Sequence, residues 1–369
     1  MVHSSFNQLS RLTKAVSIAL PLACLGAPGQ AADLPPRSAQ FPARVEQLKA
    51  HIERVDRQAE QLRAPEFPAG KDWFNSPPLT FGKQLAGKIT VLDFWTYCCI
   101  NCIHILPDLA ELEERYAGYP VAFVGVHSAK FDNEKVSENI RDAVLRYEIA
   151  HPVVNDDTMH MWQRIGVRSW PSMAVVGPKG NLMLMVSGEG NKELIDACIT
   201  AALAFHPKDI FRHDPIPMSP EKDKLRIDSP LRYPGKLAID TEGGRLFISD
   251  SSHHRIVVTD LDGNFIETIG SGRIGLADGG YDEAQFFRLQ GLAYHDGSLY
   301  VADAENHALR VVDTKAKTVR TLAGNGTQGR DYNGGKGGRE QSISTPWDVF
   351  VESGQVFIAM AGTHQIWSY

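Results

Sequence analysis

Apolar positions follow two different patterns along this chain. Between residues 41 and 205, the continuous apolar runs Ile89–Trp95 and Ser172–Val176 are interspersed with segments whose apolar residues recur at helical spacing, such as Lys192–Phe205. Continuous runs of this length are typical of strands buried inside a sheet, and their alternation with helices predicts an α/β fold. Beyond residue 231, short apolar runs are separated by turn-forming residues, which predicts an all-β domain.

Composition and length divide the chain of 369 residues into segments that fit two domains. The expected segments are a signal peptide over residues 1–32, a helical segment over 33–66, a first domain over 67–205, a proline-rich linker over 206–230 and a second domain over 231–369. The formal net charge of -6 gives no indication of nucleic-acid binding.

The first 32 residues have the pattern of a targeting segment. Arg11 and Lys14 precede the apolar run Ala15–Ala27, and the small residues that follow offer a cleavage site. The run is too short and too interrupted to span a bilayer comfortably, which favours a cleavable signal over a membrane anchor. We therefore expect a periplasmic or secreted protein, in an oxidising compartment.

One short motif carries the strongest indication of chemistry. Cys99 and Cys102 form a Cys-x-x-Cys pair directly after the apolar run Ile89–Trp95, and Pro107–Tyr116 continues as a helix. A cysteine at such a strand-to-helix turn lies beside free N–H groups and the positive end of the helix dipole, which favour the thiolate. Because Cys102 is one helical turn further on, it can form a disulfide with Cys99. The spacing predicts a dithiol that exchanges electrons with a partner's disulfide.

Two further residues fit this chemistry. Asp93 is a carboxylate inside the apolar strand, six positions before Cys99. Burial would raise its pKa and make it a proton acceptor for the inner thiol, the alternative being a core carboxylate without a catalytic role. Pro171 follows Trp170 at the start of an apolar run, where it is a candidate for a cis peptide bond.

These features together resemble the thioredoxin superfamily over about residues 67–205. The space for an additional strand and helix between Cys102 and Pro171 is similar to the TlpA-like branch of that superfamily. The resemblance implies an α/β thioredoxin-like domain.

The same resemblance implies a role for each motif residue. Cys99 would be the exposed nucleophile, Cys102 the resolving thiol and Asp93 the buried proton carrier. The substrate groove would be formed by Trp95, Trp170 and Pro171.

Two residues depart from the thioredoxin pattern. Cys98 places a third sulfur beside the nucleophile, where it is a possible extra redox thiol. Trp170 stands before the expected cis-proline, where a smaller residue is usual, so the groove would have a different shape. The crowding of Cys98, Cys99, Cys102 and His104 also allows a zinc site, but no second cysteine pair completes it. We expect no metal and no cofactor.

The second domain contains an internal repeat. The three copies are Gly244–Val258, Gly297–Val311 and Gly354–Trp367, with the matched histidines His254, His307 and His364. Each copy has a strand, a polar turn and a second strand, as a propeller blade requires. The histidine recurs at one place in every copy, which favours a structural role in the turn over a metal site. Asp250 and Asp303 also match, but the third copy has Met360 there.

These copies resemble NHL repeats, and the two domains together resemble NHL-repeat-containing thioredoxin-like proteins. About three blades do not close a ring, since propellers have about 4–8 blades. We therefore expect an incomplete propeller from a longer protein, truncated at its C-terminus.

Two functions are consistent with the sequence. The first is an exported thiol-disulfide oxidoreductase that reduces disulfides of protein substrates, receives electrons from a membrane or periplasmic thiol donor, and binds a protein partner through its propeller. The second is a non-enzymatic interaction scaffold or redox sensor. The motif residues Asp93, Cys99, Cys102 and Pro171 favour the first.

Overall fold

The computed structural model of the chain describes residues 34–224 and 229–369, so the expected signal segment lies outside the described residues. The chain forms two compact units, which meet in sequence near residue 228. The α/β unit precedes this point and the all-β unit follows it, as the apolar patterns predict. In the two described ranges, no helix is both long and apolar enough to cross a bilayer.

The first unit is built around one six-stranded mixed sheet with the order β1-β4-β3-β2-β5-β6. The strands are β1 (Trp73–Phe74), β2 (Ile89–Trp95), β3 (Val121–His127), β4 (Val153–Asn155), β5 (Ser172–Val176) and β6 (Leu182–Ser187). β2 pairs in parallel with β3 and antiparallel with β5, and all seven of its residues are buried. Its continuous apolar sequence therefore marks the centre of the sheet.

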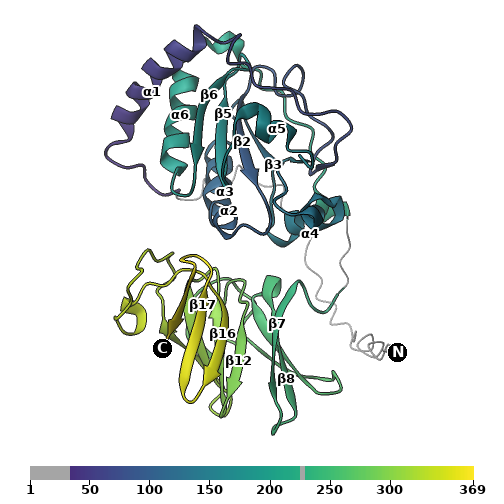
Figure 1. Cartoon of the computed structure of the whole chain (residues 1–369), viewed down its shortest axis with the longest axis vertical. Helices are drawn as coiled ribbons and strands as arrows, with labels where there is room; N and C mark the ends of the chain where they lie inside the picture. Colours follow the sequence, from purple (N-terminus) through teal and green to yellow (C-terminus); the bar gives the residue numbers. More distant parts are fainter. Residues whose placement is uncertain (1–33, 225–228) are drawn as a thin grey trace, which may run out of the picture. The chain divides into compact units, whose positions relative to one another are not determined.

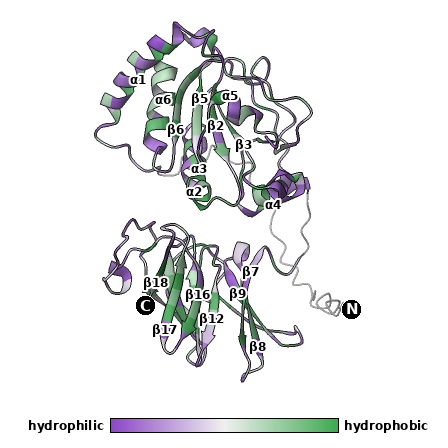
Figure 2. Ribbon diagram, in the orientation of Figure 1, coloured by the Kyte–Doolittle hydropathy of each residue, from purple (hydrophilic) through white to green (hydrophobic). Residues whose placement is uncertain are grey.

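Helices cover both faces of this sheet (Figure 1). They are α1 (Phe41–Asp56), α2 (Ile100–His104), α3 (Leu106–Arg115), α4 (Ser137–Arg146), α5 (His160–Ile165), α6 (Lys192–Phe205) and α7 (Glu221–Lys224). The helix expected within residues 33–66 is α1, which lies alongside α6 in Figure 1 and buries Phe41, Val45, Leu48 and Ile52. Figure 2 shows the hydrophobic residues gathered on the strands and α6.

The proline-rich segment after α6 is attached to the first unit as far as it is described. The Lys88 ammonium donates a hydrogen bond to the Arg212 carbonyl at 2.7 Å. The Glu221 carboxylate is buried and forms an ion pair with Arg141 at 3.1 Å. These contacts make residues 206–224 part of the first unit, although the sequence predicts a linker there.

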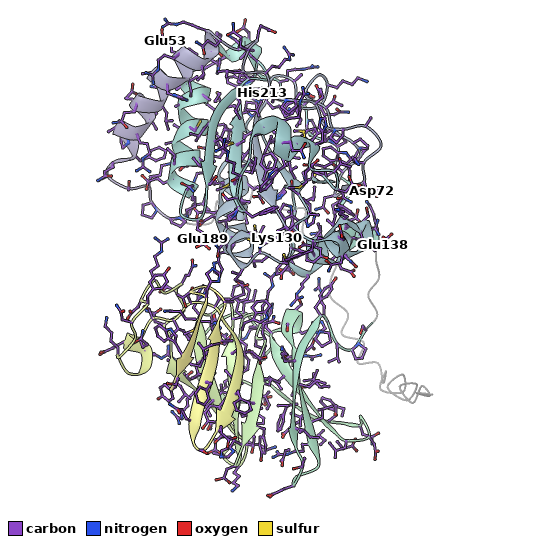
Figure 3. The ribbon with its side chains drawn as sticks, viewed as in Figure 1. Glu53, Asp72, Lys130, Glu138, Glu189 and His213 are labelled. Carbon is purple, nitrogen blue, oxygen red and sulfur yellow. The ribbon has the colours of Figure 1, made fainter. Side chains whose placement is uncertain are left out.

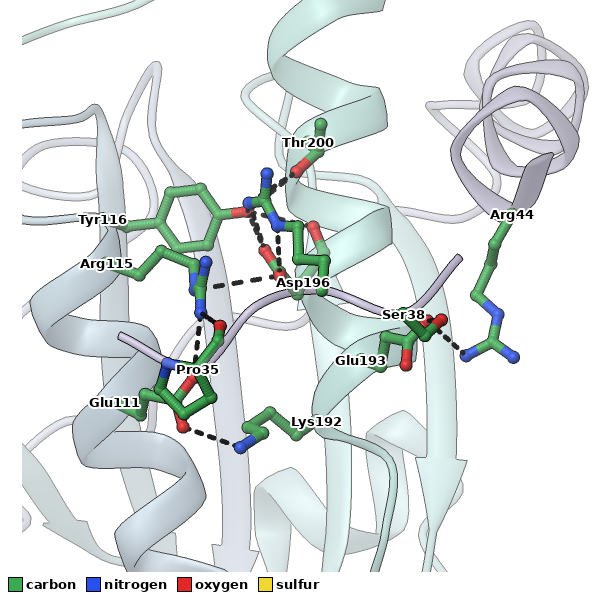
Figure 4. A network of polar contacts seen from close by, with 11 residues as sticks. Pro35, Ser38, Arg44, Glu111, Arg115, Tyr116, Lys192, Glu193, Asp196 and Thr200 are labelled. Carbon is green, nitrogen blue, oxygen red and sulfur yellow. Dashed lines mark hydrogen bonds and ion pairs between the residues drawn. The ribbon is translucent and has the colours of Figure 1, made fainter. Parts of the chain in front are cut away.

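A buried carboxylate ties the N-terminal segment to α3 and α6 (Figure 4). Arg37 donates two hydrogen bonds to Asp196, each 2.8 Å long, and the Tyr116 hydroxyl donates to the same carboxylate. Asp196 also lies 3.8 Å from the Arg115 guanidinium. Because a charge-assisted, bidentate pair fixes both position and orientation, Arg37 holds the segment before α1 against the domain.

The second unit consists of three antiparallel sheets. The first has β7 (Pro234–Asp240), β8 (Arg245–Asp250), β9 (Arg255–Asp260) and β10 (Phe265–Ile269). The second has β11 (Gly279–Gly280), β12 (Leu292–His295), β13 (Ser298–Asp303), β14 (Ala308–Asp313) and β15 (Thr318–Ala323). The third has β16 (Pro346–Glu352), β17 (Gln355–Met360) and β18 (Gln365–Ser368). The sheets are successive blades, consistent with an NHL propeller, and they do not form a closed barrel within the described residues.

The repeated histidines occupy equivalent turns. His254, His307 and His364 all have positive φ, at 54°, 47° and 56°. His254 Nδ1 accepts a hydrogen bond from the Arg288 N–H, and His307 Nδ1 accepts one from the Thr345 N–H, each ahead of the next blade's first strand. His254 and His307 therefore join one blade to the next, which is the structural role that their recurrence predicts.

The matched carboxylates stabilise the same turns. Asp250 forms an ion pair with Arg255 at 2.9 Å, and Asp303 forms one with Arg310 at 2.8 Å. The Asp303–Arg310 pair is fully buried, so either partner alone would leave an uncompensated charge. In the third copy, the matching residue is Met360, which is buried. Its side chain is apolar and therefore needs no arginine partner.

Replacement of Arg37 tests the anchoring of the N-terminal segment. Arg37→Ala leaves the buried Asp196 without its bidentate partner, so we expect the first unit to lose about 1–3 kcal/mol of unfolding free energy. Arg44→Ala is a matched control, because both side chains are 36% exposed and Arg44 contacts Glu193 only at 3.8 Å. We expect the control to lose less than about 0.5 kcal/mol. Equal losses in urea titrations of the full chain would contradict the anchoring role.

Candidate functional site

The Cys-x-x-Cys pair lies where β2 gives way to α2. Cys99 is the N-terminal cap of α2, with an extended backbone (φ -93°, ψ 108°), and is partly exposed. Cys102 is in the first turn and is fully buried. The chain thus places two thiols of unequal exposure at one helix end, as the motif predicts.

The two thiols have opposite pKa shifts. The Cys102 S–H donates a hydrogen bond to the Cys99 sulfur, and together with the Cys102 and Asn101 N–H groups it lowers the pKa of Cys99 to about 7, although burial opposes the shift. Burial raises the pKa of Cys102 well above its usual value, and the hydrogen bond and charge of Cys99 add to the rise. Near neutral pH, about half of Cys99 is therefore thiolate while Cys102 keeps its proton.

A cation from another part of the chain contributes to this shift. Lys130, labelled in Figure 3, lies in the loop after β3, and its charge also lowers the pKa of Cys99. The Lys130 ammonium lies 6.0 Å from the centre of the Trp170 ring. Sequence analysis missed Lys130, because it lies 28 positions beyond Cys102 and comes near the dithiol only in the folded chain.

The third thiol, Cys98, is held in a different electrostatic environment. Burial of its sulfur and a hydrogen bond to Glu134 raise the pKa of Cys98 to about 11. Glu134 is itself buried and accepts hydrogen bonds from the Thr96 hydroxyl at 2.6 Å and from the Cys98 N–H at 3.1 Å. The residue as a whole is exposed, yet its sulfur remains protonated near neutral pH.

Asp93 lies in the middle of β2, beneath the dithiol. Neither carboxylate oxygen has a hydrogen-bond partner among the described residues. Burial raises the pKa of Asp93 to about 7; the charges of Cys99 and Glu113 also raise it, and that of His151 lowers it. Asp93 in turn raises the pKa of Cys102, so the carboxyl and the inner thiol interact electrostatically.

The expected groove residues differ in their exposure. The Trp170–Pro171 peptide bond is cis, and the half-buried Trp170 donates a hydrogen bond to the Ser128 carbonyl at 3.0 Å. Its ring packs against Trp162 with centroids 4.2 Å apart. Trp95 is fully buried, with its ring against the His127 ring at 5.0 Å. The placement of Trp95 in the groove is therefore corrected: its strand position directs the side chain into the core.

His104 does not join the thiols in a metal-binding arrangement. Its Nδ1 lies 2.8 Å from the Glu189 carboxylate, which comes from the turn before α6. Across residues 34–224 and 229–369, no group of three or more His, Cys, Asp or Glu side chains is arranged to hold a metal ion. The contact links α2, the dithiol helix, to the turn between β6 and α6.

The pKa of Asp93 makes stability depend on pH. Its folded pKa of about 7 exceeds the usual 3.8, so between these values the folded state binds more protons, and stability falls as pH rises. Asp93→Asn removes this loss. We expect the variant to match the wild type below about pH 4 and to exceed it by about 2–4 kcal/mol at pH 8.

The control for this prediction is Asp142→Asn, which removes an exposed carboxylate from α4. Denaturant titrations across this pH range measure both variants. A constant stability difference between Asp93→Asn and the wild type would show that Asp93 does not titrate in this range.

Comparison with known proteins gives a match for each unit. Residues 87–182 match the thioredoxin-like family, and residues 231–258 match the NHL repeat. The SUPPRESSOR OF QUENCHING 1 protein of Arabidopsis thaliana, described as chloroplastic, is 52% identical over 83% of this chain and 30% of its own length. NHL repeat-containing protein 2 of Bos taurus is 46% identical over 85% of this chain and 45% of its own length. The chain therefore spans less than half the length of these two relatives.

A third relative relates the first unit to a class of enzymes. The thiol-disulfide oxidoreductase YkuV of Bacillus subtilis is 21% identical over 38% of this chain and 93% of its own length.

These relatives contradict the predicted location. One is chloroplastic and another is an animal protein, so the expectation of a periplasmic or secreted protein is wrong. A basic flank with a short apolar run was too weak a signal, because organelle-targeting segments are also positively charged and poor in acidic residues. The predicted architecture is confirmed: the chain has a thioredoxin-like domain, related to thiol-disulfide oxidoreductases, followed by an NHL repeat.

Proposed function

We propose that this chain is a thiol-disulfide oxidoreductase that acts through Cys99 and Cys102. The observation that carries the proposal is the inequality of the two thiols. Cys99 is partly exposed with a pKa near 7, whereas Cys102 is fully buried and holds its proton. In a dithiol of this kind, one sulfur attacks the substrate disulfide and the other stays protonated until it resolves the mixed disulfide.

The proposed reaction has two displacements. The Cys99 thiolate attacks a disulfide of the substrate, forming a mixed disulfide and releasing one substrate thiolate. Cys102 then gives its proton to Asp93 and attacks the Cys99 sulfur. This step breaks the mixed disulfide, forms the Cys99–Cys102 disulfide and releases the second substrate thiolate. The substrate gains two electrons, which an external thiol donor must return to the protein.

The surface beside Cys99 supports a protein substrate. The cis-Pro171 and the half-buried Trp170 precede β5, which pairs with the strand that leads to the dithiol. Lys130 and Phe131 continue this surface, and Phe131 is exposed. Aromatic and apolar side chains can bury part of a substrate, so we propose that the reactive disulfide belongs to a protein.

The pKa of Cys99 favours reduction as the direction of electron flow. Strong oxidants of this class stabilise the thiolate with a pKa of about 3.5, whereas thioredoxin has a value of about 7. Cys99, at about 7, falls with the reductants. Lys130 is the cation that the sequence motif lacks, but it is the smallest of the named causes.

For the second unit, we propose a protein-binding role. Large apolar side chains are exposed on its strands, including Leu237, Phe350 and Ile366. Exposed large apolar side chains are typical of surfaces that other protein segments cover. They also support the second candidate function, a scaffold that binds partners without redox turnover.

Replacing the resolving thiol tests the nucleophile. In Cys102→Ser, the hydroxyl retains a donor for the Cys99 sulfur but cannot resolve a mixed disulfide, so covalent adducts should accumulate. At pH 7, Cys99 has about 10³–10⁴ times the thiolate fraction of Cys98, and its lower intrinsic nucleophilicity reduces this advantage to about 100-fold. Peptide mapping of the adducts should therefore locate them at Cys99.

The controls are two double variants. Cys98→Ala with Cys102→Ser should still trap adducts, and Cys99→Ser with Cys102→Ser should not. Adducts that persist in the second double variant would assign the attack to Cys98.

A redox titration tests the direction of electron flow. We expect a potential nearer to about -270 mV, the value for thioredoxin, than to about -120 mV, the value for a strong oxidant. Equilibration of the full chain with glutathione buffers measures it, with Cys98→Ala to exclude a contribution from the third thiol. A potential above about -180 mV in both proteins would show an oxidant or isomerase instead.

A further inference from the structure

Two unpartnered nitrogens lie beside Gly125 in the core of the first unit, and the unpartnered Asp93 carboxylate lies on the strand opposite. Gly125 lies opposite Asp93 in the parallel β2–β3 pair, so a side chain there would share a face with Asp93 and Trp95. A Cβ on Gly125 would lie 3.1 Å from Trp95 Nε1 and 3.2 Å from His151 Nε2. These two nitrogens and both Asp93 oxygens are buried, and none has a hydrogen-bond partner among the described residues.

The other nitrogen of His151 leads toward the surface. His151 Nδ1 lies 2.7 Å from the Glu113 carboxylate on α3. The His151 side chain is 5% exposed and the Glu113 side chain is 23% exposed. An imidazole inside the core is thus joined to a carboxylate that reaches solvent.

The titratable groups around Asp93 come from three elements. α2 contributes Cys99 and Cys102, α3 contributes Glu113, and the segment before β4 contributes His151. The neighbouring strands contribute only Gly125 and Met173 opposite Asp93, and neither titrates. Among the described residues, His151 is therefore the one group whose positive charge acts on Asp93. Glu113 is the carboxylate paired with His151.

The protonation behaviour of the two groups supports proton exchange between them. Burial lowers the pKa of His151, but the charge and hydrogen bond of Glu113 and the charge of Asp93 outweigh it, so the pKa is raised overall. The pKa of Asp93 is also raised, to about 7. Since the pKa of Asp93 lies near neutral pH, this carboxyl is not a fixed charge there, and the raised pKa of His151 favours proton acceptance by its imidazole.

We propose that His151 and Glu113 form a proton relay that connects Asp93, and through it the Cys102 thiol, to solvent, with one water molecule beside Gly125 as the bridge. A buried water requires a polar site with about two to four hydrogen-bonding partners, which the Asp93 oxygens, Trp95 Nε1 and His151 Nε2 supply. The relay rests on the proposed oxidoreductase function and adds His151 and Glu113 to it as positioning and proton-transfer residues.

The relay balances the proton of the resolving step. Cys102 loses its proton to Asp93 as its sulfur forms the bond to Cys99 and the substrate thiolate leaves. Asp93 then passes the proton through the water to His151 Nε2, while His151 Nδ1 gives a proton to Glu113. Glu113 releases that proton to solvent, which leaves His151 as its Nε2–H tautomer until the reverse transfers restore the Nδ1–H form. Reduction of the disulfide by the external donor runs the same transfers in reverse.

The test compares two adjacent glutamates in the full chain, in a Cys98→Ala background. Reduced protein is mixed with 5,5′-dithiobis(2-nitrobenzoate), which releases one thiolate when Cys99 attacks and a second when Cys102 resolves the adduct. Glu113→Gln retains an oxygen that accepts the His151 hydrogen bond but removes the relay carboxylate. Glu114→Gln is the control, because Glu114 is the neighbouring, exposed residue on α3.

General acid–base catalysis contributes about 100-fold at the lower end of its range. We therefore expect Glu113→Gln to slow the second phase at least about 10-fold near pH 7 and to change its pH profile. The first phase should not change, and Glu114→Gln should match the background in both. Gly125→Ala, whose methyl group would crowd Trp95 Nε1 and His151 Nε2, should slow the same phase. Circular dichroism and thermal unfolding verify that each variant is folded.

Two outcomes separate the relay from the function on which it rests. Identical second-phase rates and pH profiles in Glu113→Gln and Glu114→Gln would overturn the relay, with the dithiol still active. No second release from the Cys98→Ala background itself would instead refute the proposed function.

Discussion

Burial of the central strand is the constraint on which the rest of the site depends. β2 is enclosed on both faces of the sheet, so the carboxyl within it and the thiol above it are both removed from water. Desolvation is the largest cause of the raised pKa of Asp93 and of Cys102. Cys99 caps α2 at the point where the chain emerges, and there hydrogen-bond donors stabilise its negative charge enough to outweigh its partial burial. Burial of β2 therefore gives two chemically identical thiols, Cys99 and Cys102, unequal pKa values.

The surrounding side chains preserve that inequality. Burial and the hydrogen bond to Glu134 keep Cys98 protonated, so an adjacent sulfur does not compete for the same electrophile. The His104–Glu189 contact fixes the short α2 helix, which at five residues has little intrinsic stability. Arg37 and Asp196 fasten the segment before α1 to α3 and α6, the helices on the same side of the sheet. The site is thus supported by polar contacts between segments that are far apart in sequence.

The sequence predicts the local features well, because their causes are local. The apolar run of β2 and the cysteine spacing of residues 99–102 need only strand and helix geometry to be interpreted. Trp95 shows where this reasoning fails: its nearness to the dithiol is correct, but its burial depends on which face of the strand it occupies. Lys130, Glu134, Glu113 and His151 could not be predicted, because loops and strands that meet only in the folded sheet bring them to the site. The prediction of a periplasmic or secreted location failed for a different reason, since several targeting pathways share the same weak composition signals.

The central claim is that Cys99 and Cys102 act together as a reducing dithiol. The most direct measurement is the turbidity that follows reduction of insulin by dithiothreitol, with and without the full chain. The account predicts faster reduction with the wild type, no acceleration with Cys99→Ser or Cys102→Ser, and unchanged acceleration with Cys198→Ser, whose thiol is buried in α6. A wild-type protein that reduces insulin no faster than dithiothreitol alone, or a Cys99→Ser variant that is as active as the wild type, would contradict it.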